Sequence, residues 1–112
     1  MSTRLPGAGY KRIFDRGRSI KGRLLVAWHL ADGASSGRAG VVVSKKSFHL
    51  AVERNRAKRL MREAFRLLVQ RGDAPAGTDW ILIGRSALKG RTCQDVMEEL
   101  SRVFRRIPSP RP

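Results

Sequence analysis

The sequence is short of acidic residues. It contains 9 Asp and Glu against 24 Lys and Arg, which gives a formal net charge of +15 over 112 residues. Repulsion among so many positive charges destabilises a small domain, so we expect it to bind a polyanionic partner. Two-metal hydrolytic sites need clustered carboxylates, and Asp15, Asp73, Asp79 and Asp95 form no such motif. We therefore expect no catalytic residue, no bound metal ion and no other cofactor in this chain.

Cysteine, histidine and long apolar runs are scarce as well. Cys93 is the only cysteine, so no internal disulfide can form, which is typical of an intracellular protein. No apolar run approaches the roughly 18–20 residues that span a bilayer, and the first residues lack the apolar segment of a signal peptide. His29 and His49 are too few for a metal site without cysteine or carboxylate partners. We expect an unprocessed cytoplasmic protein that has no membrane partner.

The length of the chain suits one compact domain. Residues 1–8 are small and polar and are expected to form a flexible tail. Residues 107–112, IPSPRP, cannot continue a helix and are expected to form a second tail. The domain is therefore predicted over residues 9–106.

The first half of the domain predicts a short helix and then strands. Apolar residues at helical spacing indicate a helix over 9–16. A run rich in β-forming residues predicts a strand over 19–30, with Ala27 and His29 on its less buried face. After a turn, a further strand is predicted over 38–44.

The second half predicts two helices around one buried strand. The helix over 53–70 carries an apolar stripe of helical period, formed by Ala57, Leu60, Met61, Ala64, Phe65 and Leu68. A short apolar run over 79–84 predicts a buried strand. The last helix, over 92–105, begins with a capping box in which Asp95 replaces the usual Glu. This order predicts a small α+β domain, with three helices packed on a mostly antiparallel sheet of about four strands.

The helix over 53–70 is densely cationic on the face opposite its apolar stripe. The polar residues stand at i, i+4, i+7 and i+11, namely Asn55, Arg59, Arg62 and Arg66, and Arg54, Arg56 and Lys58 flank them. Lys45 and Lys46 add two charges just upstream. A solvated surface helix is the alternative explanation, but such a surface would interleave charges of both signs. Like charges at this spacing destabilise a free helix, and phosphate groups would neutralise them. We therefore expect this helix to bind the phosphate backbone of a nucleic acid.

Three segments together resemble one protein family. Residues 14–19 read FDRGRS, residues 44–46 read SKK, and residues 54–65 read RNRAKRLMREAF. In this order and spacing they look like the bacterial ribonuclease P protein, over about residues 9–106. One departure lies in residues 47–52, SFHLAV, where the family usually has a Gly-Asn-Ala-Val run.

The resemblance implies a non-catalytic subunit of a tRNA-processing endonuclease. In this family a separate RNA uses bound Mg²⁺ to cut the 5′ leader from precursor tRNA, and the protein binds both that RNA and the leader. The positions that match the family's RNA-binding motif are Arg54, Asn55, Arg56, Lys58, Arg59 and Arg62, and those that match its paired lysines before the motif are Lys45 and Lys46. Arg66 is a further candidate RNA-binding residue because it continues the cationic stripe of the helix. Those that match its leader-binding cleft are Tyr10, Phe14 and Trp28. The family also implies a left-handed crossover from the strand before the basic helix to the strand after it.

Some alternatives stay open at this point. Tyr10, Phe14 and Trp28 could stack on leader bases or pack in the core, whereas the stripe positions of three other aromatics indicate core, namely Phe65, Trp80 and Phe104. Cys93 lies at a helix start, where a thiolate is favoured, but no catalytic partner accompanies it. A general basic RNA-binding module or a stand-alone nuclease would be rival functions. DNA binding is not expected, because no helix-turn-helix pair or zinc module is present.

Overall fold

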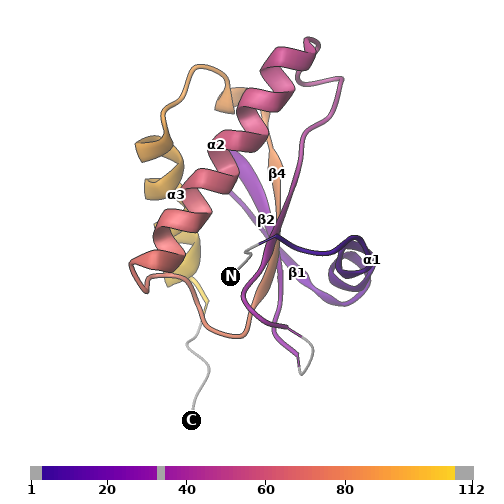
Figure 1. Ribbon diagram of the computed structural model, residues 1–112, viewed down its shortest axis with the longest axis vertical. Helices are drawn as coiled ribbons and strands as arrows, with labels where there is room; N and C mark the ends of the chain where they lie inside the picture. Colours follow the sequence, from indigo (N-terminus) through magenta and orange to yellow (C-terminus); the bar gives the residue numbers. More distant parts are fainter. Residues whose placement is uncertain (1–3, 33–34, 108–112) are drawn as a thin grey trace.

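The computed structural model describes residues 4–32 and 35–107 (Figure 1). These residues form three α-helices, a short 3₁₀-helix and a four-stranded sheet. In chain order the elements are α1 (Gly7–Arg16), β1 (Arg18–Lys21), β2 (Leu25–Leu30), β3 (Ala39–Val42), α2 (Ala51–Gln70), β4 (Asp79–Gly84), η1 (Ser86–Leu88) and α3 (Cys93–Arg105).

The sheet is mixed and mostly antiparallel, as predicted. Its strand order is β1-β2-β4-β3, in which β1 pairs with β2 and β2 with β4 in antiparallel fashion. The strands β3 and β4 are parallel, so α2 forms the crossover between them. The edge strands are therefore β1 and β3, and the most buried strand is β4.

Helices cover both faces of the sheet (Figure 1). The helices α2 and α3 pack on one face over the larger core, which includes Leu25, Ala27, Trp80 and Leu82. The helix α1 lies on the other face over a smaller core of Leu5, Ile13 and Ile81. Ala27 is fully buried under α2 and α3, so its predicted place on the less buried face was wrong. The cause is the unequal cover of the two faces, because Ala27 lies in the larger core under two helices, whereas Trp28 and Leu30 pack beside the smaller core under α1.

The predicted strand over 19–30 is a hairpin, β1 and β2, and not one strand. The Gly22 N–H donates to the Leu25 carbonyl at 2.8 Å and closes the turn. A buried carboxylate, Glu99 of α3, accepts hydrogen bonds from the backbone N–H groups of Arg23, Leu24 and Leu25. Intrinsic strand propensity does not show this turn, because a side chain that is distant in sequence stabilises it.

The N-terminal boundary lies earlier than predicted. Helix α1 begins at Gly7, and Leu5 is buried with 7% of its surface exposed. The Leu5 N–H donates to the Ala39 carbonyl at 3.0 Å, which places residues 4 and 5 beside the edge of β3. Residues 4–8 are thus part of the domain, and residues 1–3 of the predicted tail lie outside the described residues.

The other predicted boundaries differ less. Helix α2 begins at Ala51, two residues before the predicted start, and Phe48 of the preceding loop is buried. Thr92 and Asp95 form the predicted capping box of α3. Ile107 packs against the larger core, so the domain extends one residue past 106, and residues 108–112 lie outside the described part of the chain.

Candidate nucleic-acid interface

The polar face of α2 points away from the core, as its periodicity predicts. The apolar positions Ala57, Met61, Ala64, Phe65 and Leu68 are buried, and the side chains of opposite phase are directed outward. Asn55, Arg56, Arg59 and Arg62 are exposed, while Arg54, Lys58 and Arg66 are partly buried. A single helix thus joins the hydrophobic core to a row of cationic groups in solvent.

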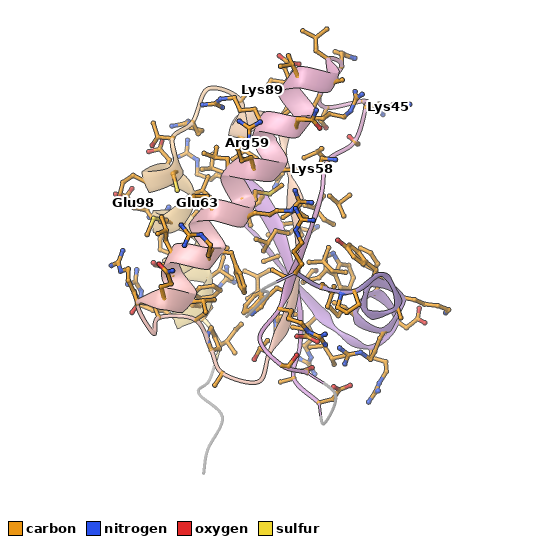
Figure 2. The ribbon with its side chains drawn as sticks, viewed as in Figure 1. Lys45, Lys58, Arg59, Glu63, Lys89 and Glu98 are labelled. Carbon is orange, nitrogen blue, oxygen red and sulfur yellow. The ribbon has the colours of Figure 1, made fainter. Side chains whose placement is uncertain are left out.

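A hollow of about 510 Å³ lies between α2 and the N-terminal segment. We call it the cationic hollow, and its walls include Arg4, Ala39, Asn55, Arg59, Arg62 and Arg66. Lys58, which is labelled on α2 in Figure 2, is also among the residues that border the hollow. The sequence patterns missed Arg4, although apolar Leu5 beside it was a sign that the segment is packed.

The hollow contains one acid, Glu63, which pairs with Arg66 at 2.6 Å. Hydrogen bonds from Arg66 lower the pKa of Glu63, so this carboxyl group stays ionised. Within residues 4–32 and 35–107, Lys58, Arg59 and Arg62 form no ion pair. These three cations are consequently available to an external anion.

Other predicted RNA-binding residues lie outside the hollow. Arg54 Nη1 donates to the carbonyl oxygens of Phe48 and His49 at 2.9 and 3.0 Å, so it ties the preceding loop to α2. Arg56 Nη2 donates to the Arg91 carbonyl at 3.2 Å. Both residues therefore have structural contacts in addition to any contact with RNA.

The two lysines before α2 are exposed in the turn that leads to the helix. Figure 2 shows Lys45 near the N-terminal end of α2, apart from Lys58 and Arg59 in the middle of that helix. The Ser47 N–H donates to Ser44 Oγ at 3.1 Å and shapes this turn. Lys45 and Lys46 thus extend the cationic surface lengthwise and do not border the hollow.

The three aromatic residues of the predicted leader-binding cleft belong to α1 and β2. The rings of Phe14 and Trp28 meet edge to face, with their centroids 5.3 Å apart, and 41% of Phe14 is exposed. Tyr10 is half-buried, and its ring lies against Gly40 of β3, where a Cβ atom would collide with it. We call Tyr10, Phe14 and Trp28 the aromatic surface, and it lies on the face of the sheet opposite α2. The predicted core aromatics are confirmed as buried, namely Phe65, Trp80 and Phe104.

The described residues hold no group of three His, Cys, Asp or Glu side chains that could bind a metal ion. The pKa of Cys93 is raised, mainly by burial and further by the charge of Glu63. Burial therefore opposes the thiolate form of Cys93 that the start of a helix favours. In the described part of the chain, no helix is both long and apolar enough to cross a membrane.

Known proteins resemble this chain along most of its length. A family model described as Ribonuclease P matches residues 6–108. The ribonuclease P protein component of an Exiguobacterium strain is 41% identical over 97 residues, which cover 87% of this chain and 82% of the relative. The component from Pelotomaculum thermopropionicum is 36% identical over 97 residues, with 87% and 84% covered.

Solved structures share the fold. The RNase P protein from Thermotoga maritima superposes with a TM-score of 0.78 at 31% identity, covering 95% of this chain and 98% of the other. The protein from Staphylococcus aureus superposes with a TM-score of 0.74 at 29% identity, and 94% of each chain is covered. Sequence, fold and the cationic face of α2 therefore agree, and the chain belongs to the family of bacterial ribonuclease P protein components.

Proposed function

We propose that this chain is the protein subunit of ribonuclease P and promotes removal of the 5′ leader from precursor tRNA. Its place of action is the cytoplasm. The observation that carries the proposal is the row of Lys58, Arg59 and Arg62, which face solvent beside a hollow and lack ion pairs within the described residues. Such a row matches the repeating charge of a polynucleotide backbone.

The proposed contact with the catalytic RNA extends along α2 and the turn before it. Its residues are Lys45, Lys46, Arg54, Asn55, Arg56, Lys58, Arg59, Arg62 and Arg66. An Arg side chain carries five N–H donors, so Arg54 and Arg56 retain donors for phosphate after their bonds to backbone carbonyls. Six to ten phosphate contacts would make RNA affinity fall by roughly 10³–10⁵ between low and moderate salt.

The proposed leader contact is the aromatic surface. Base–aromatic stacking contributes about 1–3 kcal/mol per base and accepts any base, which suits leaders of variable sequence. The exposed ring of Phe14 and the partly buried Trp28 provide such a platform. A photoreactive leader should crosslink to these two residues, and crosslinks confined to the mature tRNA body would contradict the assignment.

We place the catalytic centre in the RNA subunit, where Mg²⁺ supplies the hydrolytic chemistry. The described side chains of this chain offer no cluster of carboxylates for that ion, so no step is assigned to them. The contribution of the protein is electrostatic: it neutralises phosphates and thereby strengthens binding of substrate and Mg²⁺ by the RNA.

Reconstitution tests the proposal. The chain is mixed with a bacterial ribonuclease P RNA and precursor tRNA at physiological Mg²⁺, and 5′ processing is followed. We expect the chain to increase cleavage at this Mg²⁺ concentration, and we expect no cleavage by the chain alone. Cleavage without the catalytic RNA would indicate a stand-alone nuclease. Equal binding of leader-bearing and leaderless tRNA would indicate a general RNA-binding module.

A double variant tests the α2 assignment separately. Arg59→Ala combined with Arg62→Ala should weaken assembly with the catalytic RNA and reduce the salt slope by about two units, one for each phosphate contact. The control is Arg102→Ala combined with Arg105→Ala, which removes two exposed cations from α3. Equal slopes for the two double variants would refute the role of α2.

A further inference from the structure

We infer that the cationic hollow is a two-walled channel for a single RNA backbone strand, in which Arg4 binds phosphate from the wall opposite α2. The inference rests on the proposed function and adds a residue that lies outside the Arg-rich motif of α2. It also makes the N-terminal segment part of the RNA-binding surface.

The backbone of the N-terminal segment is held against the sheet. The Leu5 N–H donates to the Ala39 carbonyl at 3.0 Å, and Arg4 forms a parallel bridge with Ala39. Residues 4 and 5 therefore continue the sheet beyond the edge of β3. A residue fixed in this way is ordered before RNA arrives, so the complex does not bear the full entropy cost of ordering it.

Packing of the Leu5 side chain fixes the direction of the segment. Leu5 is buried with Ile13 and Ile81 in the smaller core, and its side chain fills the space that a Cβ atom on Gly9 would need. Since neighbouring residues of an extended chain point to opposite sides, burial of Leu5 directs Arg4 outward. Arg4 is exposed and borders the hollow, in agreement with this geometry.

The two walls face each other with charge of the same sign. Arg4 lies on the wall formed by the N-terminal segment and Ala39, and Arg59 and Arg62 lie on the wall formed by α2. The single acid of the hollow, Glu63, is engaged with Arg66. An excess of cations on both sides stabilises an anion held between them.

Phosphodiester groups fit this arrangement. The guanidinium groups of arginine present paired N–H donors that match phosphate oxygens. The hollow of about 510 Å³ is in the range of sites that enclose a small ligand, which suits ribose-phosphate units of one strand. A flat cationic face would contact a strand from one side, whereas this hollow would contact it from two.

The test measures binding of the full chain to a bacterial ribonuclease P RNA over a series of salt concentrations. Arg4→Ala should reduce the slope of log affinity against log salt by about one unit, as Arg62→Ala should. Arg4→Lys should retain the slope, because it preserves the charge. The matched control is Arg105→Ala, which removes an exposed cation from α3 and should leave the slope unchanged.

A second variant tests the anchoring by Leu5. Leu5→Ser keeps Arg4 but releases its segment, so it should lower the salt slope as Arg4→Ala does, and combining the two should add nothing. If Arg4→Ala behaves like Arg105→Ala, the inference is overturned. If Arg59→Ala with Arg62→Ala still lowers the slope in that case, the proposed function stands without it.

Discussion

Arg12 of α1 and Asp79 of β4 form an ion pair between the helix and the sheet. Arg12 Nη2 lies 2.6 Å from Asp79 Oδ2, and Arg12 Nη1 lies 2.7 Å from Asp32 Oδ1. Asp79 is fully buried, and its Oδ1 also accepts hydrogen bonds from the backbone N–H groups of Ser36 and Arg38. Because a buried carboxylate needs such partners, the pair ties α1 to the sheet and to the loop before β3.

Loss of Arg12 should therefore reduce recognition of the leader. Arg12→Gln releases α1, which carries Phe14, so the preference of the holoenzyme for leader-bearing over leaderless tRNA should fall toward one. This preference is measured as the ratio of the Kd for leaderless tRNA to the Kd for leader-bearing tRNA. Lys11→Gln is the matched control, because Lys11 is adjacent, equally charged and paired with Asp15 in solvent. Equal ratios for the two variants would show that Arg12 does not position the leader site.

Phe14→Ala should weaken leader binding without unfolding the protein. Its ring is 41% exposed, so little core packing is lost, while one stacking platform disappears. The loss should be about 1–3 kcal/mol, or roughly 5- to 150-fold in Kd for the leader-bearing substrate. Leu50→Ala removes another exposed apolar side chain, 60% exposed at the start of α2, and should leave leader binding unchanged. An unaltered Kd for Phe14→Ala would remove this residue from the site.

Glu63→Gln should strengthen binding to the catalytic RNA. The Glu63 carboxylate lies in the cationic hollow and engages Arg66 at 2.6 Å, so it competes with phosphate for that cation. The amide removes the negative charge and leaves Arg66 for the RNA. Glu98→Gln, on the exposed face of α3, removes the same charge elsewhere (Figure 2). Titration at fixed salt should show the larger gain for Glu63→Gln, and the opposite order would argue against RNA in the hollow.

Glu99→Ala should destabilise the fold far more than the same change at its neighbour. Glu99 is 4% exposed and accepts hydrogen bonds from three backbone N–H groups, those of Arg23, Leu24 and Leu25. Leaving these donors unsatisfied should cost at least about 2 kcal/mol in the free energy of unfolding, measured with urea. Glu98→Ala is the control, since Glu98 is exposed. Similar losses of unfolding free energy in both variants would mean that water forms hydrogen bonds with the backbone N–H groups of the turn when Glu99 is absent.

Acid should weaken the fold through His29. Burial, and to a lesser degree the charge of Arg18, lower the pKa of His29 from its ordinary value of 6.5. As the pH falls below 6.5, His29 therefore takes up a proton more readily in the unfolded chain than in the folded one. The contribution of neutral His29 to the free energy of unfolding is fully present above pH 6.5, and it is lost as the pH falls through the pKa of His29 in the folded protein.

A substitution isolates the contribution of this histidine. His29 lies against the Trp80 ring, with the ring centroids 5.4 Å apart. In His29→Gln, the free energy of unfolding should decrease less steeply as the pH is lowered below neutral. His49→Gln replaces the exposed histidine and should retain that fall. If the two variants keep the same pH dependence, other groups control it.

Some features of the fold follow from local sequence alone. The spacing of apolar residues from Ala57 to Leu68 specifies a helix that is buried on one side, and the cationic residues occupy the opposite side of that helix. The Thr92–Asp95 capping box likewise needs residues only three apart. Patterns of this kind are readable because the geometry of a helix repeats within one or two turns.

The sequence by itself thus determined the cationic helix, its buried face and the family of the chain. Only the tertiary structure decided that Arg4 lies across a hollow from Arg62, that Arg12 meets Asp79, and that Glu99 closes the turn between β1 and β2. These partners are far apart along the chain. Strand order and helix packing bring them together, and no local periodicity encodes that arrangement.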